Sequence, residues 1–275
     1  MSRVRPPAVA GAFYDADPNA LRRSVDVLLE RAKEPAVRGT LRGLVSPHAG
    51  YVYSGGAAAV GYKLLKGRTY DAVILVGPSH REFFSGASIY PGDSFRTPLG
   101  DIPIHKEIRE ELVQNCPTIK LSDAGHRSEH CLEVQLPFLQ RVLGDFSFVP
   151  IIIGSQLRET CMAVGDALAR VMTKRDVLLV ASSDLSHYHP YQDAVDLDRR
   201  VIGRVEAFDE DGLMRDLEGE RLEACGGGPV VSVMRAAKVA GANRGKALFY
   251  CNSGDITGDR EAVVGYLSAA FLQVD

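Results

Sequence analysis

Histidine and aspartate side chains, which bind metals and transfer protons, follow three short apolar segments of the chain. His48 follows the segment LRGLVSP, and His80 follows AVILVGPS. Asp184 and His187 come after a third such segment, VLLVAS. Parallel α/β sheets bind ligands outside the carboxyl ends of their strands. We therefore expect these four side chains to converge in one crevice, although they lie far apart in the sequence.

The shared position of these histidines matters more than any one of them. A single histidine in a strand-to-helix loop more often makes only hydrogen bonds. His48, His80 and His187 all follow predicted strands, so their joint case for function is stronger than each case alone. The other histidines lack this context and are expected at the surface or in a polar loop: His105, His126, His130 and His189.

Cys225 stands directly before a glycine triplet, in the segment EACGGGPVVSVM. Pro229 favours a helix start there, and the positive end of a helix lowers the pKa of a nearby thiol. Such a thiolate is a nucleophile or a metal ligand. Cys161 and Cys251 lie within apolar patterns and are expected to be buried and inert. Alternatively, the glycines could cradle an anion, although the lysine of a P-loop is missing.

The segment HRSEHCLEVQLPFL adds further polar residues to the candidate set. Glu129, His130 and Glu133 are spaced so that they could share one face of a helix, and Gln135 follows them. We assign Glu129 and His130 to substrate binding. Spacing alone favours the plainer reading, in which this segment is a solvated helix cap.

Composition narrows the functional classes. Of the 275 residues, 45% are apolar and 24% are charged, and the net charge is −3. No general affinity for nucleic acid is expected. No membrane association is expected either, since no run approaches the roughly 20 apolar residues of a membrane span. Five cysteines without a C-x-x-C pair, and no apolar leader, indicate a cytoplasmic protein.

Short β-branched runs alternate with amphipathic stretches, which predicts a single α/β domain over residues 1–275 with a mostly parallel central sheet flanked by helices. Strands are expected at Leu41–Ser46, Ala72–Val76, Ser147–Ile153, Asp176–Ser182, Ala247–Asn252 and Val263–Leu272. Helices are expected at Gly55–Leu65, Lys106–Gln114, Leu132–Leu143, Glu159–Met172, Asp193–Phe208, Asp211–Asp216 and Gly228–Val239.

The segment Ala87–Ile104 differs in character from the rest. Its short strand-like pieces are separated by PGD and TPLGD turns, which predicts a β-hairpin insert rather than a crossover. An exposed hairpin could pair with a second copy of the chain, so a homo-oligomer is one expected outcome.

Seven motifs in order resemble the Memo family, whose members include protein B of the prokaryotic AmmeMemoRadiSam system. They are PAVAGAFYDADP, VSPHAGYVYSG, VGPSH, TPLGD, SEHCLEVQLPFL, SSDLSHY and ACGGGP. The resemblance spans almost the whole chain. It implies a fold similar to that of class III extradiol dioxygenases, which use non-haem iron.

By this resemblance, His48, His80 and Cys225 correspond to the metal-site residues of the family, and Asp184 and His187 line the same pocket. Extradiol enzymes hold iron with two histidines and a carboxylate, whereas here the third ligand is a thiol. Fe(II) is the expected metal, and Cu or Zn also suits a thiolate. The system name further implies a functional link to AMMECR-type and radical-SAM proteins.

Three functions are open at this point. The first is a metal-dependent redox enzyme in which His187 acts as general acid and base, and Asp184 orients His187 or tunes the metal. The second is a non-catalytic module whose crevice binds a peptide or protein. The third is a metal-free enzyme in which Cys225 is the nucleophile and the amides of residues 226–228 stabilise an oxyanion. The sequence identifies no substrate, whether small molecule, peptide or macromolecule.

Overall fold

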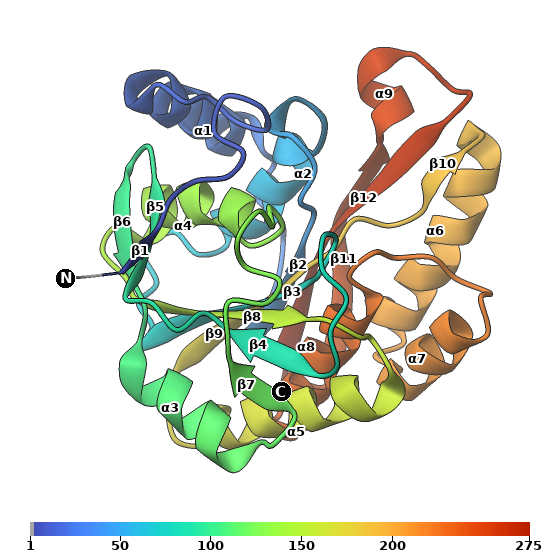
Figure 1. Cartoon of the computed structure of the whole chain (residues 1–275). Coiled ribbons are helices and arrows are strands. Elements are labelled where there is room, and N and C mark those ends of the chain that lie inside the picture. The colour runs from blue at the N-terminus through green and yellow to red at the C-terminus, as the bar shows by residue number, and fades with distance from the viewer. Residues whose placement is uncertain (1–2) are drawn as a thin grey trace.

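A mixed nine-stranded sheet forms the centre of the molecule, and helices cover both of its faces (Figure 1). The computed structural model describes residues 3–275. The strands of this sheet are β2 (Thr40–Ser46), β3 (Ala72–Pro78), β4 (Ala87–Ile89), β7 (Ile119–Leu121), β8 (Phe148–Ile153), β9 (Val177–Ser182), β10 (His187–His189), β11 (Arg244–Asn252) and β12 (Val263–Gln273). Their order is β10-β12-β2-β9-β3-β8-β4-β7, and β11 also pairs with β12.

The four middle strands, β2, β9, β3 and β8, are parallel to one another. Every residue of β3 (AVILVGP) is buried, as expected for a strand covered on both faces. The outer pairings β12–β2, β11–β12, β10–β12 and β4–β8 are antiparallel. The predicted single-domain α/β fold with a helix-flanked sheet is therefore confirmed, with a parallel centre and a mixed periphery.

The two faces of the sheet build two hydrophobic cores. Ile74 and Val76 face one core, and their neighbours Val73 and Leu75 face the other, because successive side chains of a strand alternate. The first face is covered by α3 (Lys106–Asn115), α5 (Arg158–Met172), α6 (Tyr191–Glu206), α7 (Glu210–Glu218) and α8 (Gly227–Val239). The second is covered by α1 (Pro18–Arg31), α2 (Tyr51–Lys63) and α4 (Leu136–Leu143). The short helix α9 (Ser253–Thr257) precedes β12.

A small second sheet contains the predicted hairpin. Strands β5 (Ser94–Thr97) and β6 (Gly100–Pro103) pair antiparallel across the TPLGD turn, and β1 (Val4–Arg5) joins β5 in parallel. The hairpin covers less of the segment Ala87–Ile104 than predicted, because β4 belongs to the main sheet. The N-terminal strand thus occupies the free edge of β5.

Two helices illustrate further differences from the expectation. The predicted helix over residues 132–143 begins instead with a 3₁₀ turn, η1 (Glu133–Gln135), before α4. Helix α1 was not predicted, although its start signal was present: Asp17 caps the Ala20 amide, and Pro18 stands at the first helical position.

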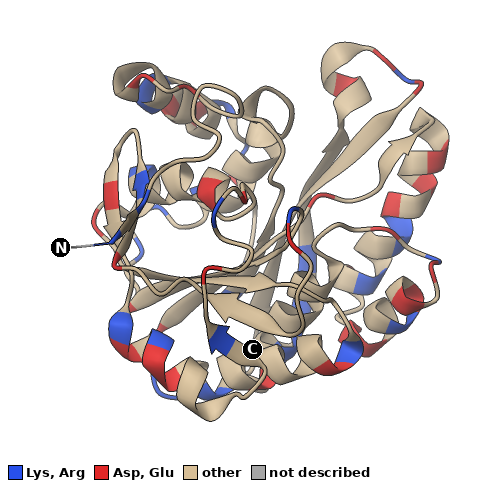
Figure 2. Cartoon of the chain, viewed as in Figure 1, with Lys and Arg blue, Asp and Glu red and all other residues tan. Residues whose placement is uncertain are grey.

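Charged residues of both signs are interspersed along the outer helices (Figure 2). Helices α5 and α7, for example, are joined by ion pairs of Arg158 with Asp211 and Glu218. Within residues 3–275, no helix has the combination of length and apolar character that a membrane crossing requires.

Candidate metal centre

The strand ends bring the predicted residues together. Strands β2, β9 and β3 are parallel neighbours, and His48, Asp184 and His80 each lie two residues beyond the end of one of them. The rings of His48 and His80 meet edge to face with centroids 5.0 Å apart. His187 begins β10 in the same loop region as Asp184.

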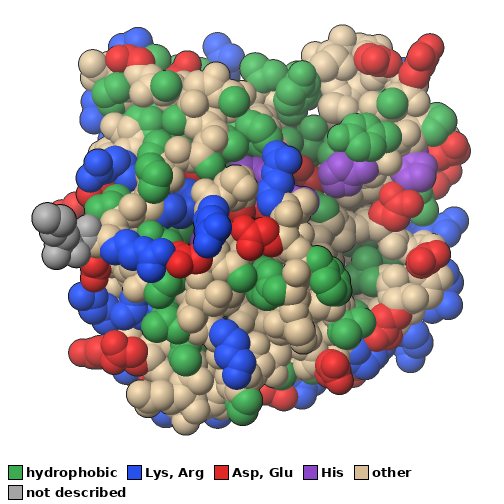
Figure 3. All heavy atoms as spheres, viewed as in Figure 1, with side chains coloured by type: hydrophobic (Ala, Val, Ile, Leu, Met, Phe, Trp, Pro, Cys, Tyr) green, Lys and Arg blue, Asp and Glu red, His purple; other side chains and the backbone are tan. Residues whose placement is uncertain are grey.

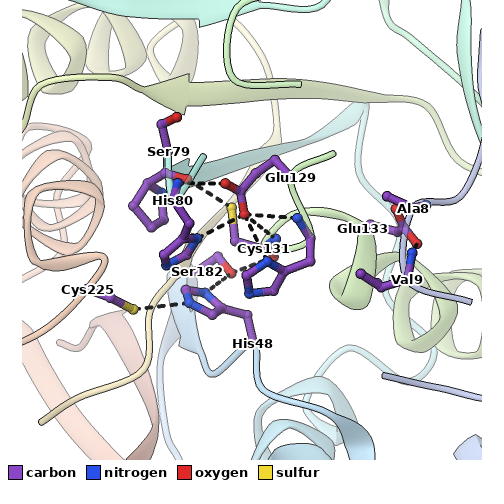
Figure 4. Close-up of polar contacts among 12 residues, drawn as sticks. Ala8, Val9, His48, Ser79, His80, Glu129, Cys131, Glu133, Ser182 and Cys225 are labelled. Atoms are coloured by element: carbon purple, nitrogen blue, oxygen red, sulfur yellow. Dashed lines mark hydrogen bonds and ion pairs between the residues drawn. The ribbon is translucent and has the colours of Figure 1, made fainter. Parts of the chain in front are cut away.

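Cys225 completes a group of three donors. Its Sγ lies 3.1 Å from His48 Nε2, and one donor atom from each of His48, His80 and Cys225 can be chosen so that all three lie within 4.8 Å of one another (Figure 4). Two imidazole nitrogens and a sulfur at this spacing match the ligand chemistry of iron, copper or zinc. The three residues come from three different loops, after β2, after β3 and before α8.

The hydrogen bonds of His48 determine which of its nitrogens is free. Its Nδ1 lies 2.9 Å from Ser182 Oγ, and the Ser182 hydroxyl donates to the carbonyl of Cys131 at 2.7 Å. The hydroxyl has only one proton, so it must accept from the ring, as it also does from Gln135 Nε2 at 2.8 Å. His48 therefore carries its proton on Nδ1 and directs the Nε2 lone pair toward Cys225.

His80 is oriented in the same way by a carboxylate. Glu129 Oε1 lies 2.9 Å from His80 Nδ1, and Glu129 Oε2 accepts the His80 backbone amide at 2.7 Å. Burial acts to raise the pKa of Glu129, but hydrogen bonds and charge from His80 hold it well below its ordinary value. The ionised carboxylate accepts the proton of His80 Nδ1, which leaves Nε2 as the ring nitrogen that can bind a metal.

These contacts favour a positioning role for Glu129 over the predicted substrate contact. The residue is only 3% exposed, and its Oε1 also accepts the backbone amides of His130 (2.9 Å) and Cys131 (3.1 Å). Its oxygens are therefore saturated by protein donors. A carboxylate arranged in this way fixes the loop on which it lies.

His130 packs directly against the two histidine donors. Its ring stacks on that of His80, with centroids 4.8 Å apart, and meets the His48 ring edge to face at 5.4 Å. Phe13 packs against it at 4.8 Å. Burial lowers the pKa of His130 to about 4, so its ring is neutral at pH 7. This position is compatible with the predicted substrate contact.

Cys225 lies directly before α8, as predicted, but its thiol is not activated. Burial raises the pKa of Cys225, and the charge of Asp184 raises it further. The Asp184 backbone amide donates to Sγ at 3.2 Å. The prediction that the helix terminus lowers the pKa of this thiol is therefore wrong, because desolvation outweighs the helix terminus.

The glycine triplet does not form an anion cradle. The amide of Gly226 donates to Ser183 Oγ at 3.0 Å, that of Gly227 to the Ala224 carbonyl at 3.0 Å, and that of Gly228 to Gln156 Oε1 at 2.7 Å. A side chain on Gly226 would collide with the Ser182 carbonyl. The glycines thus allow α8 to approach the end of β9, and the predicted oxyanion site is not present.

Asp184 and His187 act on different parts of the site. Asp184 is buried, and its Oδ1 accepts the His48 backbone amide at 2.7 Å. Burial raises the pKa of Asp184 to about 7. No hydrogen bond within residues 3–275 joins Asp184 to His187, so the expected role of orienting His187 has no contact to support it. The other expected role, tuning the metal, has one: the hydrogen bond from the His48 amide. His187 lines a pocket together with Cys225, and burial lowers its pKa.

A second donor group overlaps the first. One donor atom each of His80, Glu129 and Cys131 also lie within 4.8 Å of one another. In this group His80 and Glu129 already bind each other, and the buried Cys131 thiol donates to the Pro78 carbonyl at 3.2 Å. The group of His48, His80 and Cys225 is the better candidate because both of its imidazoles have Nδ1 engaged elsewhere and Nε2 left to bind a metal.

Similarity to known proteins covers nearly the whole chain. A family model described as Memo-like protein matches residues 5–270. The chain belongs to the Memo-like family. A MEMO1 family protein of Methanopyrus kandleri is 38% identical over 97% of this chain and 98% of its own length. Another, from Methanocaldococcus jannaschii, is 40% identical over 98% and 99%.

A solved structure shows the same fold at much lower sequence similarity. An uncharacterized protein from Escherichia coli K12 superposes with a TM-score of 0.58 and 16% identity, over 84% of this chain and 100% of its own. The similarity supports the α/β fold of this Memo-like chain and carries no information on its activity.

Two residues that support the Memo-like site were not predicted from the sequence. Ser182, at the end of β9, binds the His48 ring. Gln156, three residues beyond the end of β8, binds the Cys225 carbonyl through its Nε2 at 2.7 Å. Both lie near strand ends, as His48 and His80 do, but serine and glutamine are not among the usual ligands of iron, copper or zinc.

Proposed function

We propose that this Memo-like protein binds Fe(II) through His48, His80 and Cys225 and uses it in an oxygen-dependent redox reaction, related to that of the class III extradiol dioxygenases. The observation that carries the proposal is the three donor atoms within 4.8 Å, with Nδ1 of both histidines already engaged by a neighbouring side chain. Copper or zinc suits the same ligands. Keeping Cys225 reduced requires a compartment such as the cytoplasm.

The protein residues around the metal would have separate tasks. Iron would offer an open position for oxygen or substrate and would relay electrons from the substrate, which is oxidised, to oxygen, which is reduced. Ser182 and Glu129 hold the two imidazoles in the ligating tautomer and orientation. His187, which lies on the wall of the pocket with Cys225, would accept or return a substrate proton. We also retain the proposed link to AMMECR-type and radical-SAM proteins, which rests on family resemblance.

Anaerobic titration with Fe(II), followed by metal analysis after desalting, tests this proposal. Wild-type protein should retain about one iron per chain, and His48→Ala, His80→Ala and Cys225→Ala should each lose it. Cys251→Ala is the matched control, because Cys251 is also a buried free cysteine and lies on β11, outside the donor group. Absence of bound iron in the wild type, or full retention in Cys225→Ala, would refute the metal site.

A non-catalytic binding module is the second candidate, and one observation favours it. Large apolar side chains are exposed shortly after three of the site histidines: Val52 (75%), Phe83 (89%) and Tyr188 (75%). Histidine side chains reach the same face as hydrophobic ones in Figure 3. A peptide or protein that binds this surface should still bind when His48 and His80 are replaced by alanine, which a pulldown with both variants would show.

A further inference from the structure

A pocket of about 560 Å³ opens beside the donor group, and Cys225 and His187 form part of its wall. Most of the remaining wall is aliphatic and comes from helix α7, the segment after β9, and the segments before α5 and α8: Leu157, Leu185, Met214, Leu217, Leu222 and Ala224. A cavity of this size accommodates a small organic molecule. Because two candidate site residues line it, a ligand in the pocket would reach them directly.

The charges around the pocket indicate which ligands it excludes. Among the described residues, its wall contains no lysine or arginine, and its carboxylates are Glu218 and Glu223. Glu218 is bound by Arg158 at 2.8 Å, and Glu223 lies 2.8 Å from His189. The wall therefore offers no free cation to an anionic ligand. A carboxylate or phosphate entering it would lose water without gaining a partner.

We propose that this pocket binds the uncharged aliphatic arm of the substrate and holds the reacting group against Cys225 and His187. The assignment of this arm to a substrate rests on the proposed metal-dependent function, whereas the binding preference follows from the pocket wall alone. Within residues 3–275, no Phe, Tyr or Trp lines this wall, so it offers aliphatic contact rather than ring stacking. Burial of apolar surface then supplies the binding energy.

A homologous series of primary alcohols from 1-butanol to 1-octanol tests this preference on the full-length protein. With methionine methyl groups labelled with ¹³C, the Met214 signal should shift on titration, because Met214 lines the pocket. Met172, at the end of α5 and outside the pocket, is the internal reference. Affinity should rise about fourfold for each added methylene, the gain for burying one CH₂ group.

Charged analogues of equal length test the exclusion of anions. Octanoate should bind at least tenfold more weakly than 1-octanol, because its carboxylate would lose water in the pocket without gaining a cationic partner. An affinity that does not depend on chain length, shifts of Met172 equal to those of Met214, or octanoate binding as tightly as the alcohol would each overturn the proposal.

Two variants test whether the alcohol binds in the pocket. Leu217→Trp should fill the space and abolish the Met214 shifts, and Leu121→Trp, on the edge strand β7, should leave them unchanged. Leu157→Asp is the second variant in case Leu217→Trp disturbs folding: Leu157 is 57% exposed, so its replacement leaves the core intact and should still weaken octanol binding. Wild-type affinity in Leu157→Asp would contradict the assignment.

The outcome of the alcohol titration should not depend on the metal site. Repeating the alcohol series on His80→Ala, which removes a proposed iron ligand outside the pocket wall, should leave the chain-length dependence in place. Wild-type protein that binds 1-octanol but no iron would refute the metal site alone. Wild-type protein that binds iron, but whose affinity for the alcohols does not depend on their chain length, would refute the pocket alone.

Discussion

At the residue scale, neighbouring side chains determine what His48 and His80 can do. Ser182 and Glu129 each occupy one Nδ1, so Nε2 is the nitrogen of each ring that is left to bind a metal beside Cys225. The sequence predicted His48 and His80 from strand ends, because that rule depends only on local pattern. It did not predict their hydrogen-bond partners: 49 residues separate His80 from Glu129 and 134 separate His48 from Ser182, and such pairings depend on tertiary structure.

Replacing the carboxylate that orients His80 tests this arrangement. Glu129→Gln should lower Fe(II) affinity about 10- to 100-fold, because the neutral amide no longer strengthens and orients the imidazole ligand. Glu210→Gln is the matched control, since Glu210 is also a buried carboxylate but pairs with Lys238 on the far helices. Competition with a chromophoric chelator measures both affinities. Equal affinity in wild type and Glu129→Gln would show that the carboxylate has no such role.

At the element scale, a buried ion pair ties the N-terminal strand to the loop of the site. Arg5 on β1 lies 2.6 Å from Glu133, which also accepts the hydroxyl of Tyr14 at 2.5 Å and the amides of Ala8 (2.7 Å) and Val9 (3.0 Å). The guanidinium of Arg5 also donates to the Glu129 carbonyl. The sequence placed Glu133 near the site but not this contact, because β1 is too short for a periodic signal.

Removing the arginine should destabilise the whole chain. Arg5→Ala leaves Glu133 buried without its cation, which costs about 3 to 5 kcal/mol of unfolding free energy. Arg3→Ala removes an exposed pair with Asp123 in the same segment and should have a much smaller effect. Urea denaturation compares the two. A change in Arg5→Ala no greater than in Arg3→Ala would mean that this network does not hold the segment.

At the scale of the whole molecule, the pattern of apolar residues predicted the centre of the sheet but not the pairing of the strands at its edges. Fully apolar runs such as Ala72–Val76 predicted the parallel centre, since strands covered on both faces have that pattern. The antiparallel outer strands and the main-sheet position of β4 depend on long-range pairing. His126 shows the same limit: it was expected in a polar loop, but it is 1% exposed and contacts Ser88 in the interior.

Burial of His126 should make global stability depend on pH. Desolvation lowers the pKa of His126 from its ordinary 6.5 to about 3. Between these values the unfolded chain binds one proton more than the folded chain, so unfolding free energy rises with pH, by up to about 1.4 kcal/mol per unit. In His126→Gln this slope between pH 4 and 6 should decrease by about that amount, as measured by urea titrations across this range. Parallel stability curves for the two proteins would contradict it.

The identity of the thiolate ligand is the central claim, and iron K-edge X-ray absorption of anaerobically loaded protein tests it most directly. The spectrum of the wild type should contain one sulfur scatterer together with nitrogen. The sulfur should vanish in Cys225→Ser and persist in Cys131→Ser, which alters the overlapping donor group of His80, Glu129 and Cys131. Sulfur that persists in Cys225→Ser, or a wild-type spectrum with only nitrogen and oxygen ligands, would contradict the proposed centre.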